Sequence, residues 1–414
     1  MPTIFIASPF FPPSALPPSQ RVRLLVRHLH ELGWNAVVFT VEPRYREEQP
    51  DPWMMEITGN NFEKITVKAW DQKKTRKFGV GDLGIRMFLG LFRSILRQVK
   101  KEKPDLILYP VPPWYIMLMA PLIRRITKIP YAIDYIDPWV FKLKNRDLKA
   151  RLSQWIAKRT EGMVLRRSGA TFAVSEGILD ELRLRYPELK SRPMIAVPYG
   201  VEASDYQTIN AEMNTNGKVL MRYTGAVSEN MLPVIDVLLK AMKKLNDSIP
   251  LEIQFTGTTY AGAGLAKPVL VQTIKANKVG NFVVENPSRV GYQTALELGM
   301  GADFQLLIGD ITPYYAASKM MGLVASGKPF FALLNKDSFP ATFLRQIQYK
   351  DMVLFSPDQL GNPALTEIVY QGLLKAIKNK DQYKAVSTDH PVFSKYTAMA
   401  MTKTFTDTFQ KIIR

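Results

Sequence analysis

The stretch from Ser318 to Pro329 combines residue types that could bind an anion. Ser318 is suited to cap a helix, Gly327 favours a left-handed stop and Pro329 prevents continuation, so we expect a helix of about two turns. Free N–H groups at the start of such a helix favour a phosphate, and Lys319 would add a full positive charge. The alternative is an ordinary helix of an α/β domain.

Other residues near predicted strand ends in this half of the chain could contact the same ligand. They are Arg222, Arg289, Asp310, Tyr314 and Tyr315. Each has an ordinary alternative. The arginines could form surface salt bridges, Asp310 could cap the turn that follows it, and the tyrosines could pack over a loop.

The first half of the chain offers candidates for binding a second substrate and for catalysis. Asp134 and Asp137 lie in a predicted strand, residues 131–137, and Trp139 follows it. Asp137 and Asp134 could be catalytic and Trp139 could bind the second substrate, although an Asp-Pro pair also commonly starts a turn. Arg21, at a predicted helix start, could bind a phosphate of that substrate or be solvated.

The composition excludes several kinds of chemistry. The chain has no cysteine, which excludes a thiolate nucleophile, a disulfide scaffold and a cysteine-ligated metal. The three histidines lie within a helical pattern or before a proline, so none is placed as a general base. Clustered metal ligands do not stand out, and we expect no metal and no cofactor.

The elements that position these residues alternate between buried strands and amphipathic helices. This pattern predicts parallel sheets covered on both faces, and 414 residues are too many for one ordinary core. We therefore expect an α/β chain of two doubly wound, Rossmann-like domains facing a cleft. The predicted parts are an N-terminal domain (1–205), a linker (206–217), a C-terminal domain (218–390) and a C-terminal segment (391–414) whose helix packs back on the first domain.

The order of short motifs along the chain resembles the GT-B glycosyltransferases, specifically the family 4 type. The motifs are Pro12-Pro13 with Ser19-Gln20-Arg21, Asp105 to Leu108, Ile129 to Trp139, Val174-Ser175-Glu176, Val197 to Glu202, Tyr223-Thr224-Gly225 and Ser318 to Pro329. The resemblance implies transfer of a hexosyl-type sugar from a nucleotide-activated donor with retention of configuration and without a metal. It makes 1–205 the acceptor-side domain and 218–390 the donor-side domain, and it makes the second substrate an acceptor that Arg21 and Trp139 would bind. It also places Gly225 where the backbone approaches a diphosphate.

Two features depart from that family pattern. A glutamate that holds the donor ribose and a second one eight positions upstream are replaced by Gly322 and Tyr314. The usual arginine and lysine after the donor-domain glycine are replaced by residues 226–231, Ala-Val-Ser-Glu-Asn-Met. Three explanations are open for these departures. The donor differs from that of the family, other residues take the place of the usual ones, or the protein does not catalyse transfer.

The charge and hydropathy patterns restrict the kinds of partner and the cellular location that we expect. A formal net charge of +18 suggests anionic partners, and no nucleic-acid recognition motif is present. The basic segment 73–103 predicts either a core-facing helix with a basic outer face or a contact with an anionic membrane. The chain lacks the pattern of a signal peptide, so we expect a cytoplasmic protein that could be peripheral on the inner face of the membrane.

The leading functional hypothesis is a glycosyltransferase that acts on a saccharide or lipid-linked acceptor in cell-surface polysaccharide or glycan assembly. The main alternative is a noncatalytic binding or scaffold protein with a degenerate donor site. A nucleotide-sugar epimerase on the same architecture is a third hypothesis, which the scarcity of histidines disfavours.

Overall fold

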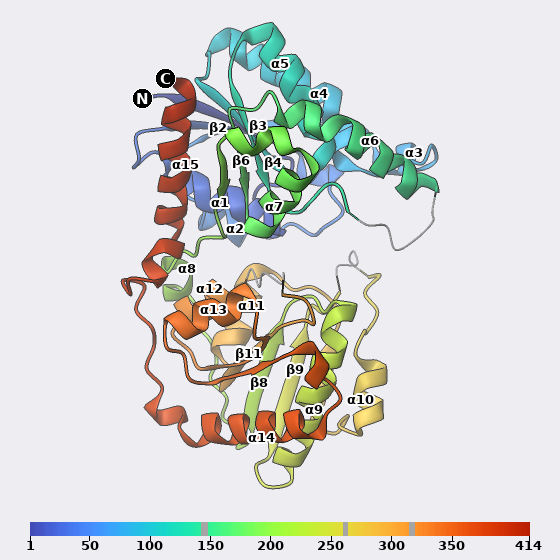
Figure 1. Ribbon diagram of the computed structural model, residues 1–414, viewed down its shortest axis with the longest axis vertical. Helices are drawn as coiled ribbons and strands as arrows, with labels where there is room; N and C mark the ends of the chain where they lie inside the picture. Colours follow the sequence, from blue (N-terminus) through green and yellow to red (C-terminus); the bar gives the residue numbers. More distant parts are fainter. Residues whose placement is uncertain (142–147, 260–263, 314–318) are drawn as a thin grey trace. The chain divides into compact units, whose positions relative to one another are not determined.

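The computed structural model describes residues 1–141, 148–259, 264–313 and 319–414. The chain forms two compact units: unit 1 comprises Met1–Gly200 with Ala398–Arg414, and unit 2 comprises Val201–Thr397. Each unit is built around one parallel β-sheet with helices packed against it (Figure 1). The predicted fold of two doubly wound parallel-sheet domains is confirmed.

The sheet of unit 1 has the strand order β3-β2-β1-β4-β5-β6-β7, and all of its pairings are parallel. Phe5 on β1 is paired with Val37 of β2 on one side and with Ile107 of β4 on the other. The strands are β1 (Thr3–Ala7), β2 (Asn35–Val41), β3 (Glu63–Val67), β4 (Leu106–Val111), β5 (Tyr131–Tyr135), β6 (Ala170–Ala173) and β7 (Met194–Ala196).

The helices of unit 1 pack on the two faces of this sheet. They are α1 (Pro17–Leu29), α2 (Trp53–Glu56), α3 (Gln72–Arg76), α4 (Leu83–Lys101), α5 (Ala120–Thr127), α6 (Leu148–Leu165), α7 (Glu176–Arg185) and α15 (Ala398–Ile413). A 3-10 helix, η2 (Trp114–Met119), precedes α5. The sequence predicted a helix start near Arg21, but α1 begins at Pro17, because proline fits the first turn, where an N–H has no helical partner.

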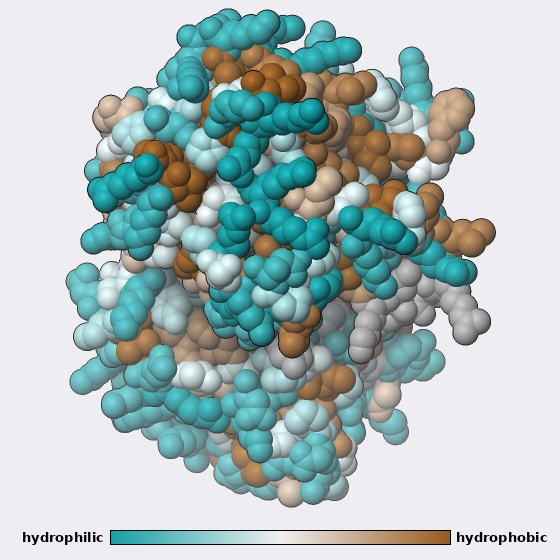
Figure 2. Space-filling model, turned by 45° about the horizontal axis from the view of Figure 1, so that its top comes forward, coloured by the Kyte–Doolittle hydropathy of each residue, from teal (hydrophilic) through white to brown (hydrophobic). Residues whose placement is uncertain are grey.

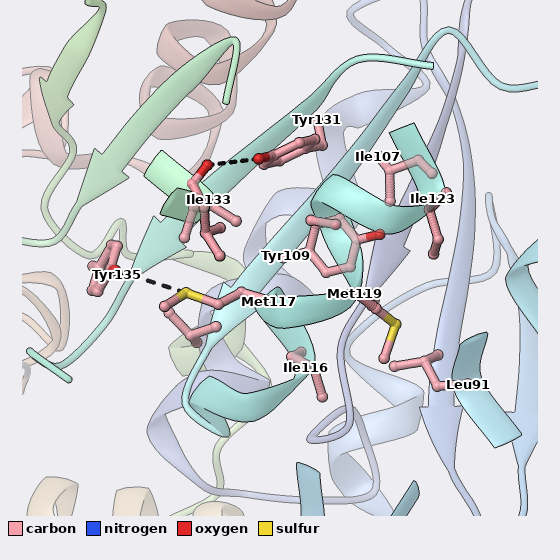
Figure 3. Packing of buried hydrophobic residues seen from close by; sticks show 14 of the residues in the cluster. Leu91, Ile107, Tyr109, Ile116, Met117, Met119, Ile123, Tyr131, Ile133 and Tyr135 are labelled. Atoms are coloured by element: carbon pink, nitrogen blue, oxygen red, sulfur yellow. Dashed lines mark hydrogen bonds between the residues drawn. The ribbon is translucent and has the colours of Figure 1, made fainter. Parts of the chain in front are cut away.

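Alternate residues of each strand supply the two cores of unit 1. Phe5 belongs to the cluster beneath α4, α5 and α6, whereas its neighbours Ile4 and Ile6 belong to the cluster beneath α1 and α15. In the first cluster the Tyr131 hydroxyl donates to the Val164 carbonyl at 2.6 Å (Figure 3). Burial on both faces explains why the strands read as continuous apolar runs in the sequence.

Helix α4 lies within the basic segment 73–103, for which the sequence predicted two arrangements. Its side chains Leu83, Met87, Leu91 and Ile95 are buried in the first cluster, at the spacing of one helical face. Of the two predicted arrangements for this segment, the core-facing helix with a basic outer face is therefore the one observed.

The C-terminal helix α15 is part of unit 1, although it follows unit 2 in the sequence. It packs against α1, and Phe409 lies edge-on to Trp34 with ring centroids 5.5 Å apart. Phe405 is tilted against Phe172 of β6 at 4.4 Å. The aromatic residues at helical spacing near the C-terminus thus complete the core beneath α1.

The sheet of unit 2 has the order β10-β9-β8-β11-β12-β13 and is parallel throughout. Its strands are β8 (Val219–Thr224), β9 (Leu251–Thr256), β10 (Val283–Asn286), β11 (Phe304–Ile308), β12 (Phe330–Asn335) and β13 (Met352–Phe355). Its helices are α8 (Ser204–Gln207), α9 (Leu232–Asn246), α10 (Val271–Asn277), α11 (Tyr292–Met300), α12 (Met320–Ala325), α13 (Phe339–Gln346) and α14 (Pro363–Lys378).

Candidate functional site

The most distinctive polar arrangement of unit 2 lies where its strand order reverses. The chain passes from β8 outward to β9 and β10, then returns to β11 on the opposite side of β8. Loops that leave the carboxyl ends of strands at such a reversal diverge and leave room for a ligand. Gly225 directly follows β8, and Lys319 follows the loop that leaves β11.

Lys319 reaches back across this edge to the end of β8. Its Nζ donates a hydrogen bond to the Thr224 carbonyl oxygen at 3.0 Å and lies 3.4 Å from the centre of the Tyr223 ring. Burial of the ammonium group lowers the pKa of Lys319 to about 7. An anionic ligand at this position would restore the charged form.

Glycines let the neighbouring backbone approach the lysine. Gly225 has φ +144°, and a Cβ built on it would lie 2.7 Å from Lys319 Nζ. Gly257, after β9, has φ +74°, and its built Cβ would lie 3.7 Å from the Cα of Arg289. Loops after three neighbouring strands therefore meet around a buried cation, an arrangement that suits a phosphate or diphosphate group.

The described part of α12 lies within the predicted anion-binding helix. Gly327 is left-handed at φ +65°, as predicted, and α12 covers Met320–Ala325, which agrees with the predicted length of about two turns. The lysine side chain and the glycine loops are the features of this edge whose charge and open backbone suit an anion. The predicted cap Ser318 and the predicted contacts Tyr314 and Tyr315 lie outside the described residues.

The remaining predicted donor-side residues have different surroundings. Arg222 donates to the Gln254 side chain and to the Leu298 carbonyl, both at 2.8 Å, so its guanidinium ties β8 to β9 and to the end of α11. Asp310 accepts hydrogen bonds from the Thr312 N–H at 2.6 Å and its hydroxyl at 2.7 Å, which is the turn-capping alternative. Arg289 is exposed beside Gly257.

Gly322 on α12 faces a residue that the sequence did not single out. The hydroxyl of Tyr206, from α8, lies within the space that a Cβ on Gly322 would occupy. Tyr206 is buried in the cluster that also contains Met321 and Leu323. The position where the family resemblance implies a ribose-holding glutamate is therefore filled by a tyrosine from another element.

A second residue missed from the sequence organises the loop after β9. Glu285 of β10 accepts hydrogen bonds from the Thr258 hydroxyl at 2.5 Å, the Val269 N–H at 2.8 Å and the Leu270 N–H at 2.9 Å. This carboxylate fixes the chain on both sides of the loop that starts at Gly257. A lone glutamate in a short strand carries no sequence signal for this role.

In unit 1, the predicted residues Arg21 and Asp134 form a buried ion pair. Arg21 Nε and Nη2 donate to Asp134 Oδ2 and Oδ1, each at 3.0 Å, and both side chains are almost fully buried. Arg21 Nη1 donates to the Pro198 carbonyl at 3.0 Å, and the guanidinium also lies 5.0 Å from the Phe405 ring centre. The pair connects α1, β5, α15 and the chain after β7.

Asp137 is exposed to solvent, whereas Trp139 is buried. Asp137, just beyond β5, is exposed as a residue, yet desolvation of its carboxyl group by the surrounding protein raises its pKa above the ordinary value. Its carbonyl oxygen accepts from the indole N–H of Trp114 at 3.1 Å, which joins the loops after β4 and β5. Trp139 is buried edge-on against Tyr115, so its ring packs in the core.

Within residues 1–141, 148–259, 264–313 and 319–414, no group of three or more histidine, cysteine or carboxylate side chains is placed to hold a metal ion.

The N-terminal part of the chain matches a known family. Residues 18–200 match the glycosyl transferase 4-like domain. No curated protein matches the whole sequence significantly.

Solved structures match nearly the full length. Sucrose-phosphate synthase from Thermosynechococcus elongatus is 12% identical with a TM-score of 0.64, covering 100% of this chain and 99% of its own. Anabaena HepE in complex with UDP-glucose is 12% identical with a TM-score of 0.61, covering 99% and 100%. Trehalose 6-phosphate synthase from Burkholderia multivorans is 12% identical with a TM-score of 0.58, covering 99% and 96%. The chain therefore has the GT-B fold of glycosyltransferases, and its residues 18–200 match the glycosyl transferase 4-like domain.

Proposed function

We propose that the protein transfers a sugar from a nucleotide-activated donor to a saccharide or lipid-linked acceptor in cell-surface polysaccharide or glycan assembly. The observation that carries this proposal is the meeting of Gly225, Gly257 and the buried Lys319 ammonium at the edge of unit 2. A diphosphate would supply negative charge beside the Lys319 ammonium. The similarity in fold to HepE, which was solved with UDP-glucose, supports a nucleotide sugar as the donor.

The proposed mechanism assigns separate roles to the two units. Lys319 and the backbone at Gly225 hold the donor diphosphate, with Arg289 at its margin, and stabilise the negative charge that develops as the sugar leaves. The bond between the anomeric carbon and the phosphate oxygen breaks. The acceptor oxygen bonds to the same face of the carbon and gives its proton to the departing phosphate, so configuration is retained without a metal or another cofactor.

Asp137 is the acceptor-side residue that we propose to contact the reacting hydroxyl. Its position after β5, its exposure and its raised pKa suit a carboxyl group that orients an acceptor hydroxyl. Asp134 is held by Arg21 in the buried pair, so we propose that these two residues position the end of β5 rather than touch the acceptor.

Nucleotide binding is the first test of this function. Titration calorimetry with nucleoside diphosphates should show binding that weakens by roughly 10-fold to 100-fold in Lys319→Ala, because a hydrogen bond to a charged group contributes about 1.5–3 kcal/mol. Lys243→Ala is the matched control, since Lys243 is exposed in the last turn of α9. Absence of binding by the unmodified protein across a broad panel of nucleotides and nucleotide sugars would reject the proposal.

One observation favours a second function, a noncatalytic binding or scaffold protein. Tyr206 occupies the space beside Gly322 where the family resemblance implies a carboxylate for the donor ribose. A protein of this kind would bind a nucleotide without consuming a nucleotide sugar. Thin-layer detection of transfer or donor hydrolysis that is lost in Lys319→Ala and retained in Lys243→Ala would exclude it.

A further inference from the structure

The outward face of α6 in unit 1 carries large apolar side chains that are exposed. Leu148 is 77% exposed, Leu152 59% and Trp155 57%. Their spacing of four and three residues places them on one side of the helix. The opposite side packs into the core through Ala157 and Leu165, so the exposed residues belong to an ordered helix with a fixed orientation.

Basic side chains surround these apolar residues. Arg151, Lys158 and Arg159 are exposed on the same helix, and the Arg159 guanidinium lies 5.7 Å from the centre of the Trp155 ring. The acidic residue within α6 is Glu161, which is buried and bonded to Arg185, Tyr135 and Tyr186. The solvent side of α6 therefore presents cationic and apolar groups together.

This arrangement differs from that of α4, the basic helix of the same unit. Helix α4 buries Leu83, Met87, Leu91 and Ile95 and exposes Leu89 alone to 46%, whereas α6 exposes three large apolar side chains side by side. The helix lies on the side of the sheet opposite α15 (Figure 1). In the space-filling view, hydrophobic surface lies among hydrophilic side chains over unit 1 (Figure 2).

We propose that the α6 face, defined as Leu148, Arg151, Leu152, Trp155, Lys158 and Arg159, docks on the surface of an anionic lipid bilayer. A tryptophan with neighbouring leucines enters the boundary between head groups and acyl chains, while arginine and lysine contact the lipid phosphates. None of the helices in the described ranges has the length and hydrophobicity needed to cross a membrane. Docking on the membrane surface requires neither that helix length nor that hydrophobicity.

Charge distinguishes this partner from a second copy of the chain. A symmetric dimer through the α6 face would place its basic residues against the same residues of the partner, whereas an anionic bilayer offers opposite charge. The net charge of +18 acts in the same direction. The proposal concerns where the protein resides and does not depend on its catalytic activity.

Vesicle co-sedimentation of the full chain tests the proposal. The protein should bind vesicles of phosphatidylcholine with phosphatidylglycerol more tightly than phosphatidylcholine alone, and added salt should weaken the binding. Leu152→Ser/Trp155→Ser should reduce partitioning by at least roughly tenfold. Arg151→Gln/Lys158→Gln/Arg159→Gln should reduce it by on the order of a hundredfold, since each basic residue near the surface contributes about fivefold.

The matched control is Val271→Ser/Ile368→Ser, which removes two exposed apolar side chains of unit 2. It should bind vesicles as the unmodified protein does, and circular dichroism should show that every variant is folded. Quenching of Trp155 fluorescence by brominated lipid, measured against Trp155→Phe, reports insertion independently of partitioning. Equal binding of both serine double variants would overturn the proposal, as would a dimer, seen by light scattering, that the α6 substitutions dissociate.

Discussion

The Tyr206 hydroxyl occupies the space into which any side chain at position 322 would extend. Tyr206 comes from α8, directly after the start of unit 2, whereas Gly322 lies in α12. Since a Cβ would meet the hydroxyl oxygen and approach the ring carbon that bears it only to 3.4 Å, the hydroxyl itself is the obstacle. Gly322 and Tyr206 are therefore coupled, and neither can be changed without consequences at the other.

Gly322→Ala should lower the free energy of unfolding by about 1–3 kcal/mol in the native background, because overpacking outweighs the helix preference of alanine. In the Tyr206→Phe background, which lacks the obstructing oxygen, the same substitution should cost much less. Denaturant unfolding of the four proteins gives the coupling energy. Gly280→Ala is the control, since its Cβ would meet only Ile274 at 3.7 Å. Additive effects would contradict the proposed coupling.

Nucleotide affinity should depend on pH through Lys319. Its pKa of about 7 in the free protein means that the ammonium loses its proton as pH rises through neutrality. Binding of a diphosphate should raise this pKa and take up a proton, so affinity should fall by up to about tenfold per pH unit between pH 7 and pH 9. Calorimetry in buffers of different ionisation enthalpy measures the proton uptake. Lys319→Met should lose this dependence, and an unchanged pH profile would remove Lys319 from the phosphate site.

Lys319→Met should stabilise unit 2 while weakening nucleotide binding. The folded-state pKa of Lys319 lies below the unfolded value of 10.5, so between these values the unfolded chain binds more protons and native stability rises with pH. The advantage of the variant should therefore be largest below pH 7 and decline toward pH 10.5. Thermal unfolding at several pH values measures it, at about 2–4 °C per kcal/mol for domains of this size. A destabilised variant at pH 6 would contradict the assigned burial.

Gly225→Ala should impair both stability and nucleotide binding. The substituted residue would be held at φ +144°, and its Cβ would displace the Lys319 ammonium. Strain of this kind costs on the order of 1–3 kcal/mol, and the displaced lysine should weaken diphosphate binding further. Calorimetry and thermal unfolding should be compared with Gly280→Ala, which lies outside the left-handed region. Full nucleotide affinity in Gly225→Ala would place the diphosphate elsewhere.

Arg21→Met should destabilise unit 1 by about 3–5 kcal/mol, because it leaves the Asp134 carboxylate buried without its partner. Arg21→Met/Asp134→Leu should lose less than the single variant, since both charges are removed together. Urea unfolding measures both effects. Native stability combined with a raised acceptor KM in Arg21→Met would instead assign Arg21 to acceptor binding.

Much of the fold follows from local patterns in the sequence. Apolar strands, helical spacing of leucines and valines, and turn-forming glycines and prolines predict two parallel-sheet domains because secondary structure depends on short-range steric and burial preferences. The left-handed conformation of Gly327 and a core-facing side of α4 could be predicted from the sequence for the same reason. The start of α1 was misplaced because two prolines and a serine are all compatible with a first helical turn.

Only part of the candidate site could be predicted from the sequence. Gly225 and Lys319 were identified from the sequence, and the structure brings them together through the parallel pairing of β8 and β11. Arg222 has a side chain of the right type, but the fold provides it with Gln254 and a helix carbonyl as partners. Whether a charged residue binds a ligand or the protein depends on neighbours distant in sequence.

The sequence by itself determined the fold class, the order of the elements and the residue types available for binding, because these depend on composition and local spacing. Only the tertiary structure decided that Arg21 and Asp134 pair in the core, that Tyr206 fills the space beside Gly322 and that Leu148, Leu152 and Trp155 remain exposed. These are contacts, or missing contacts, between segments far apart in the chain. Their geometry is set by packing, which no local pattern encodes.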